Sequence, residues 1–300
     1  MPRTAPAPAA APGSRSAQAL IARFRRAGNP RAAALIVTLY GDAIAPRGGR
    51  AWLGAIARLL EPLGISERLV RTAVFRLVQS GWLRGEACGR RTDYALSEAA
   101  AAESAQAEAR IYARAAPAWD GLMRAALPLP GTDARAREAL RRRLAWLGYG
   151  ELPGPLWIHP SASPPADAHL LALSSAALPA TQSRALAASA WPLDTLSRAW
   201  GGFARRHAAL ADDAQHATPA QAALARLLLI HEYRLLLLRD PGLPAGLLPE
   251  GWKGEAARAL AAQAYTGLWR ASEVQLRETL VCADGRQPAL LARYARRFTD

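Results

Sequence analysis

Three arginines and a threonine recur at helical spacing in one short segment of the chain, and such a set can read DNA. The set is Arg68, Arg71, Thr72 and Arg76, with Phe75 and Gln79 on the same face. A guanidinium can pair with two acceptors of guanine, and threonine or phenylalanine can touch the methyl group of thymine. Because the N-terminal half of a recognition helix usually reaches the bases, we expect Arg68, Arg71 and Thr72 to contact base edges and Arg76 to contact phosphate.

The opposite face of this segment is aliphatic and predicts a helix that packs on a core. That face is formed by Leu69, Val70, Ala73, Val74, Leu77 and Val78. Ser66 is a typical N-cap and Gly81 a typical residue after the last turn. A shorter helix over 52–60 precedes it and ends at Pro62 and Gly64.

A tight β-hairpin with a basic tip follows the helix at once. Its strands are predicted over 83–87 and 92–96, around Gly89, Arg90 and Arg91. We expect Arg90 and Arg91 to contact phosphate or to enter the minor groove. The succession of helix, turn, basic helix and hairpin is typical of a winged helix-turn-helix, whereas a solvated basic helix of an arginine-rich protein is the plainer alternative.

Further phosphate contacts are expected near the start of this region. Arg47 lies in the loop before the helix over 52–60, and Arg23, Arg25 and Arg26 form a second basic cluster. Both could lie beside the backbone of a duplex, where cations favour binding whatever the sequence.

The charge distribution points to a polyanion as partner of the N-terminal part of the chain. The net charge is +14, and arginine supplies all basic residues except Lys253. Residues 21–100 hold 13 arginines and 6 acids, whereas 101–300 hold 23 basic and 18 acidic residues. The excess is therefore denser in the segment that carries the hairpin and the basic helix.

The remainder of the chain predicts an α/β part followed by a helical part. Strand-like runs at 119–127, 154–160 and 169–178 surround a charged helix at 133–147, which indicates a small α/β sandwich. Helices are predicted at 31–44, 97–114, 194–211, 219–239 and 255–280.

The sequence gives no support to an enzyme. It has no nucleophile elbow, zinc-protease motif, phosphate-binding loop or dinucleotide-binding motif, and its histidines show no metal-ligand spacing. Cys88 and Cys282 lie too far apart in sequence to suggest a disulfide framework or a zinc site. No run of 18 apolar residues occurs, so we expect a cytoplasmic protein without a membrane partner. From the missing motifs we expect no catalytic residue, no metal and no cofactor.

Several segments resemble the PaaX family of transcriptional repressors of phenylacetic acid degradation genes. They are GDAIAPRGGRAWLGAIARLLEPLGISERLVRTAVFRLVQSGWL with GRRTDYALSE, WDG at 119–121, GPLWIHP at 154–160, and LIHEYRLLLLRDPGLPAGLLPEGW at 229–252. The resemblance covers residues 21–280. A proline-rich N-terminal extension and a high alanine content depart from the family pattern outside the segment expected to read DNA.

The resemblance implies an α+β, mainly helical fold in three domains. These are a winged helix-turn-helix at 21–97 after a disordered tail at 1–20, a ferredoxin-like central domain at 118–185 similar to a CRISPR adaptation nuclease, and a helical C-terminal domain at 186–300. A connector helix at 98–117 precedes the central domain.

The resemblance also implies a homodimer that binds a double-stranded operator and that an acyl-CoA effector, phenylacetyl-CoA, releases. Alternatives are a regulator that answers to another acyl-CoA or aromatic ligand, and a non-catalytic nucleic-acid-binding assembly module. The effector site stays unassigned, because the run Arg141, Arg142 and Arg143 is most simply a solvated helix face.

Overall fold

The computed structural model describes residues 13–28, 32–113 and 119–298, and the chain forms two compact units. The first contains residues up to 113 together with 204–234 and 258–300; the second contains 114–203 and 235–257. Three helices cross these limits, namely α8 (Leu193–Asp213), α9 (Pro219–Leu237) and α10 (Gly254–Thr279). The three predicted domains therefore do not coincide with the two units, although the predicted helices over 194–211, 219–239 and 255–280 are confirmed.

The first unit joins the N-terminal elements to parts of the last three long helices, namely residues 204–234 and those from 258 onward. In chain order its N-terminal elements are α1 (Arg15–Arg26), α2 (Ala32–Leu39), a π-helical turn η1 (Tyr40–Ile44), η2 (Ala45–Arg47), β1 (Arg50–Trp52), α3 (Leu53–Leu60), η3 (Glu61–Leu63), α4 (Glu67–Gln79), β2 (Leu83–Cys88), β3 (Arg91–Leu96) and α5 (Glu98–Ile111). The short helices η4 (Ala214–His216) and η6 (Ala292–Arg296) complete it. The predicted order of helix, turn, helix and hairpin is present.

Helix α4 begins and ends where its sequence predicts. The Ser66 hydroxyl accepts a hydrogen bond from the Leu69 amide at 3.3 Å, and Gly81 adopts a φ of 73° after the last turn. Val70, Ala73, Val74 and Leu77 are buried, which fits the contacts of α4 with α2 and α3. Leu69 is 37% exposed, so its predicted place on the buried face was wrong. It lies in the first turn, at the margin of the apolar face.

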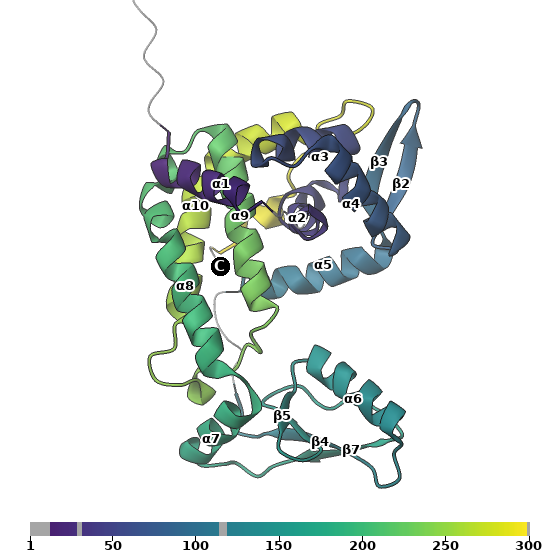
Figure 1. Cartoon of the computed structure of the whole chain (residues 1–300), viewed down its shortest axis with the longest axis vertical. Helices are drawn as coiled ribbons and strands as arrows, with labels where there is room; N and C mark the ends of the chain where they lie inside the picture. The colour runs from purple at the N-terminus through teal and green to yellow at the C-terminus, as the bar shows by residue number, and fades with distance from the viewer. Residues whose placement is uncertain (1–12, 29–31, 114–118, 299–300) are drawn as a thin grey trace, which may run out of the picture. The chain divides into compact units, whose positions relative to one another are not determined.

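The hairpin of β2 and β3 (Figure 1) belongs to a three-stranded antiparallel sheet of order β1-β3-β2. Cys88 pairs with Arg91, so the turn consists of Gly89 and Arg90 alone, and the φ of 58° at Gly89 suits glycine at the first turn position. The sequence did not predict β1, because three residues are too few to show a period of two.

Helix α1 is anchored to α8 and α9. The carboxylate of Asp213 accepts hydrogen bonds from the Ser14 hydroxyl at 2.9 Å and from the Ser16 amide at 3.2 Å. Arg23 forms an ion pair with Glu232 at 2.7 Å. The disordered tail predicted over 1–20 was therefore wrong for the start of α1, while residues 1–12 lie outside the described part.

The carboxylate of Asp42 is the centre of a buried ion network. Arg226 on α9 donates from Nε to Oδ2 at 2.8 Å, and Arg297 donates from Nη1 to Oδ1 at 3.3 Å. The hydroxyls of Tyr112 and Tyr265 donate to Oδ1 at 2.6 and 2.9 Å. Burial alone would raise the pKa of Asp42, but the Arg226 and Arg297 cations outweigh it and hold the pKa below its usual value.

Three further charged residues complete this set, which we term the Asp42 network. Arg226 also binds Glu273 at 2.6 Å, Arg47 binds the same carboxylate, and Arg297 binds Glu108 at 3.0 Å. The network thus holds three arginines and three acids, so its charges balance. Such balance is needed, because burying an unpaired charge is costly.

The network also holds the π-helical turn η1 that continues α2. The carbonyl of Asp42 accepts from Arg297 Nη1 at 2.7 Å and from Arg226 Nη2 at 3.0 Å, and the carbonyl of Gly41 accepts from Arg297 Nη2 at 2.9 Å. A π-turn disturbs the regular pairing of backbone carbonyls, and the two guanidinium groups satisfy them instead.

A second buried contact joins α2 to α9. The Thr38 hydroxyl and Nδ1 of His231 lie 2.9 Å apart, and His231 is 8% exposed. Burial, with the nearby Arg234 cation, lowers the pKa of His231 from 6.5 to about 4. The imidazole is therefore neutral at pH 7 and acts as a hydrogen-bonded core residue.

The C-terminal strap, residues 280–298, ties α10 to the N-terminal elements. The carbonyl of Val281 accepts from the Trp52 amide at 3.1 Å, and the Ala283 amide donates to Asp93 Oδ1 at 2.7 Å. Further along, the Leu291 amide donates to the Pro46 carbonyl at 3.0 Å before Arg297 enters the Asp42 network. The base of the hairpin thus depends on the end of the chain.

The second unit contains the predicted α/β part. Its elements are β4 (Arg124–Pro128), α6 (Ala134–Trp146), β5 (Gly150–Leu152), β6 (Leu156–His159), β7 (Leu170–Ser174), α7 (Ala180–Ala190) and η5 (Ala245–Leu247). The sheet order is β5-β6-β4-β7 with antiparallel pairs throughout, which is the strand order of a ferredoxin-like unit. The second helix, α7, follows the last strand instead of preceding it. Strand β7 forms one edge, where Leu171 and Leu173 are exposed.

Asp42→Ala is expected to lower the free energy of unfolding by roughly 3–5 kcal/mol, because it leaves buried arginines without a counter-charge. Urea unfolding followed by circular dichroism measures the change. Asp284→Ala is the control, since it removes an exposed ion pair and an exposed backbone hydrogen bond, both with Arg286, and should change stability much less. An Asp42→Ala loss no larger than that of the control would contradict the importance of the network.

Acid should destabilise the protein through His231. The unfolded chain protonates this histidine near pH 6.5, whereas the folded chain does so only near pH 4. Stability is therefore lost as the pH falls from 6.5 towards 4, by about 2 kcal/mol at pH 5. Urea unfolding measures the free energy of unfolding at pH 7 and at pH 5. The difference between the two values should be smaller for His231→Gln than for the wild type, and the same as in the wild type for the exposed His216→Gln.

Candidate nucleic-acid interface

The outer side of α4 presents all the residues of this helix that were predicted to face DNA. We term this surface the arginine face; it comprises Arg68, Arg71, Thr72, Phe75, Arg76 and Gln79, all of which are exposed. Phe75 is 61% exposed, which is unusual for so large an apolar side chain. The aliphatic face beneath buries α4 against α2 and α3, and this packing turns the arginine face outward.

Two contacts within α4 involve side chains of the arginine face. Arg71 Nη2 lies 2.7 Å from Glu67 Oε1, and both side chains are more than 60% exposed. The Thr72 hydroxyl donates to the carbonyl of Arg68 at 3.0 Å. An exposed pair of this kind contributes little to stability and opens easily, so Arg71 is available to an external acceptor.

The hairpin places its two arginines differently. Arg90 occupies the turn and is exposed. Arg91 starts β3, where its guanidinium carbon lies 4.4 Å from the centroid of the Trp52 ring and its Nη1 lies 3.4 Å from the carbonyl of Ala283. Arg91 therefore has a structural contact with the C-terminal strap, whereas Arg90 is the freer candidate for a phosphate contact.

The structure corrects one predicted site residue. Arg47 is 3% exposed, pairs with Glu273 and donates to the Ala43 carbonyl at 2.7 Å. A guanidinium held in this way does not reach a phosphate, so Arg47 belongs to the Asp42 network and not to the interface. Nothing in the loop sequence revealed this, because its partner lies 226 positions away.

Three cations that the sequence reading did not select lie near the hairpin. Arg84 on β2 and Arg50 on β1 pair with Glu86 at 3.0 and 2.6 Å, and Arg84 remains 63% exposed. Arg58 on α3 is exposed, with its guanidinium carbon 5.4 Å from the Trp52 ring centroid. Arg50 and Arg84 lie on either side of Ala95, with which both pair, but the sequence could not group them because it did not predict β1.

Other charged residues outside α4 and the hairpin have ordinary surface contacts. Arg141 pairs with Glu138 at 2.8 Å and Arg143 pairs with Asp167 at 3.2 Å, as expected for a solvated helix face. Asp120 forms an ion pair with Arg124. Across residues 13–28, 32–113 and 119–298, no group of three His, Cys, Asp or Glu side chains could hold a metal ion.

A helix must be long and apolar enough to cross a membrane. Within the described part of the chain, every helix is too short or too polar to cross a bilayer.

Comparison with known families matches the chain in three consecutive segments. Residues 31–100 match the model of the PaaX-like protein, 117–179 match the PaaX protein central Cas2-like domain, and 191–278 match the PaaX-like protein C-terminal domain. The first segment contains α4 and the hairpin.

Individual relatives agree with these matches. Over 287 residues the chain is 36% identical to the transcriptional repressor PaaX of Escherichia coli (strain K12), which covers 88% of this chain and 89% of that protein. The uncharacterized protein Rv0674 from Mycobacterium tuberculosis has a similar structure, with a TM-score of 0.52, 26% identity and coverage of 78% of this chain and 95% of that one. The chain therefore belongs to the PaaX family.

Proposed function

We propose that the chain is a transcriptional repressor that binds DNA through a winged helix-turn-helix. Its targets are genes of aromatic catabolism, and those of phenylacetate degradation are the first candidates. The arginine face of α4 carries this proposal. It combines three exposed guanidinium groups with an exposed aromatic ring on one helix, and a hairpin with a basic turn follows that helix. The 36% identity to the transcriptional repressor PaaX supports the same function.

In this proposal α3, η3 and α4 are the helix-turn-helix, and β2 and β3 are the wing (Figure 1). Helix α4 enters the major groove, where Arg68, Arg71 and Thr72 read base edges. Arg76 and Arg90 contact phosphates, which fixes the register of the protein on the duplex. Arg91 adds positive charge at the wing while Trp52 limits its motion.

We further propose a homodimer on a two-fold operator, with two copies of α4 in successive major grooves roughly 34 Å apart. An aryl-acyl-CoA, of which phenylacetyl-CoA is the first candidate, releases the DNA because it binds the DNA-incompetent state more tightly than the DNA-competent state. Family membership supports both ideas. Light scattering of the free protein and of its complex with DNA measures the number of chains, and a single chain per operator would contradict the dimer.

Arg71→Ala and Arg90→Ala are expected to weaken DNA binding in different ways. Arg71→Ala should cost about 1–3 kcal/mol on duplexes selected by the wild type from a random pool, and much less on random DNA. Arg90→Ala should weaken both and lower the salt slope by about one.

Fluorescence anisotropy at two salt concentrations measures these effects, with Arg137→Ala on α6 as a control for the loss of one exposed cation. Equal losses on selected and random DNA for both variants would rule out base reading by α4. Full binding by both would rule out this interface.

Glu67→Gln is expected to tighten binding to every duplex by about two-fold or more. The substitution releases Arg71 from its ion pair and removes one negative charge from the face that approaches the phosphates. Anisotropy titrations in low salt test it. Weaker binding would instead mean that Glu67 holds Arg71 in the orientation that DNA requires.

A further inference from the structure

Phe75 lies within the arginine face, but the hydrogen bond and the ion pair of that face do not involve it. Its side chain is 61% exposed, the largest exposed fraction of any large apolar side chain in the portion of the chain that the structure describes. An aromatic ring in water costs free energy that contact with another apolar group recovers. The ring therefore suits an apolar partner outside the chain.

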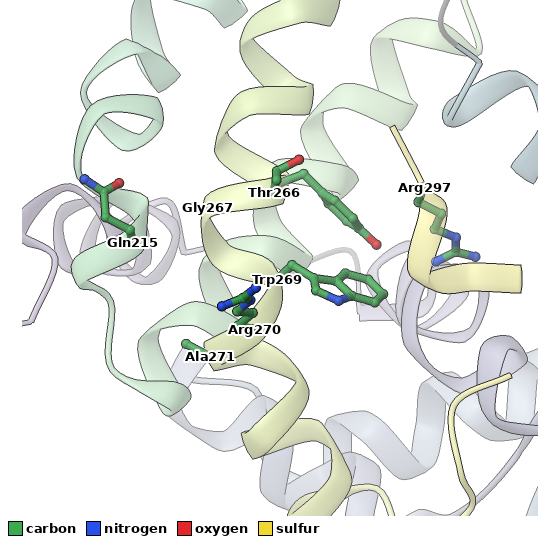
Figure 2. Close-up of a pocket in the computed structure, with 8 residues that line it drawn as sticks. Gln215, Thr266, Gly267, Trp269, Arg270, Ala271 and Arg297 are labelled. Atoms are coloured by element: carbon green, nitrogen blue, oxygen red, sulfur yellow. The ribbon is translucent and has the colours of Figure 1, made fainter. Parts of the chain in front are cut away.

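Two other aromatic rings of the first unit have partners in the protein itself. Trp269, which lines a pocket over α10 (Figure 2), has the guanidinium carbon of Arg226 4.4 Å from its ring centroid. Trp52, at the end of β1, has that of Arg91 at the same distance of 4.4 Å. Among the described residues, Phe75 forms no such contact with a ring or a cation.

The neighbours of Phe75 indicate what covers the ring. Arg71 and Thr72 lie four and three residues before it on the same side of α4, and Arg76 adjoins it. A protein that covered Phe75 would also bury these two guanidinium groups, which is costly unless it supplied an acid to each. A DNA duplex supplies phosphates to the arginines, and its major groove offers the C5-methyl group of thymine as an apolar contact.

We propose that Phe75 contacts the C5-methyl group of a thymine and is a specificity-determining residue of α4. The inference rests on the proposed function, since the contact requires α4 in the major groove. Residues four apart on a helix are separated by about 6 Å along its axis, which is about two base-pair steps. The thymine should therefore lie within about two base pairs of the base that Arg71 contacts.

Thr72 is the rival for this contact, because a threonine methyl group can also touch thymine. The Thr72 hydroxyl donates to the carbonyl of Arg68 at 3.0 Å, so it is already occupied within the helix. Phe75 carries the larger apolar surface of the two, and the whole of its ring can lose water on contact. The methyl contact is accordingly assigned to Phe75.

Duplexes in which uracil replaces thymine test the contact, because uracil lacks the C5-methyl group and pairs with adenine in the same way. The wild type first selects tight-binding duplexes from a random pool, and fluorescence anisotropy then compares their thymine and uracil forms. The wild type should bind the thymine form about four-fold more tightly for each methyl group that Phe75 contacts. Phe75→Ala should bind both forms with nearly equal affinity.

Two further variants are matched controls for this comparison. Leu238→Ala removes an apolar side chain that is 60% exposed and belongs to the second unit, so it should keep the wild-type ratio of affinities. Thr72→Ser removes the methyl group of the rival residue and should keep that ratio too. Any effect of uracil on the shape of the duplex is common to all variants, so the change in ratio reports the contact itself.

Replacement of one thymine at a time locates the contact within the selected duplex. The loss of affinity should be confined to a single thymine in each half-site. That thymine should lie within about two base pairs of the position at which Arg71→Ala relaxes specificity.

The outcomes separate this inference from the proposed function. A wild type that binds selected DNA but does not distinguish thymine from uracil would overturn the role of Phe75 and leave the repressor function intact. The wild-type ratio in Phe75→Ala, or a ratio lost only in Thr72→Ser, would overturn it as well. Failure to bind any duplex would overturn the proposed function, and this inference with it.

Discussion

The carboxylate of Asp42 is the interaction on which the first unit depends. It accepts hydrogen bonds from two buried arginines and two tyrosines that come from α9, α10, the strap and the residue directly after α5. A charge in this position has no water to replace a lost partner, so the elements that supply the partners must assemble together. The N-terminal helices consequently form one compact unit with residues 204–234 and 258–298, although the family models divide them into separate segments.

The same network explains why the chain tolerates a π-turn next to the helix that packs on α4. The irregular backbone of η1 leaves carbonyl groups that regular helical bonds would satisfy, and Arg226 and Arg297 bond to them directly. The turn is thus held by side chains from distant parts of the sequence.

Local signals predicted α4, the hairpin and the three long C-terminal helices well, because caps, turn glycines and helical periodicity are contained in the sequence itself. Short elements escaped: β1 and β5 have three residues each, and α7 is so rich in alanine that no apolar stripe marks it. Arg47 was misassigned for another reason. Whether an arginine is a surface cation or a buried partner depends on Glu273, and pairing at such separation leaves no local trace.

The α4 helix and the hairpin obtain their positive charge from arginine alone, since residues 66–96 contain neither lysine nor histidine. Acetyltransferases, which neutralise lysine, have no target on this surface, and a guanidinium keeps its proton throughout the physiological range. Lysine acetylation and pH changes in the physiological range therefore leave the positive charge of this surface unaltered. Under the proposed function, neither would control DNA binding through these side chains.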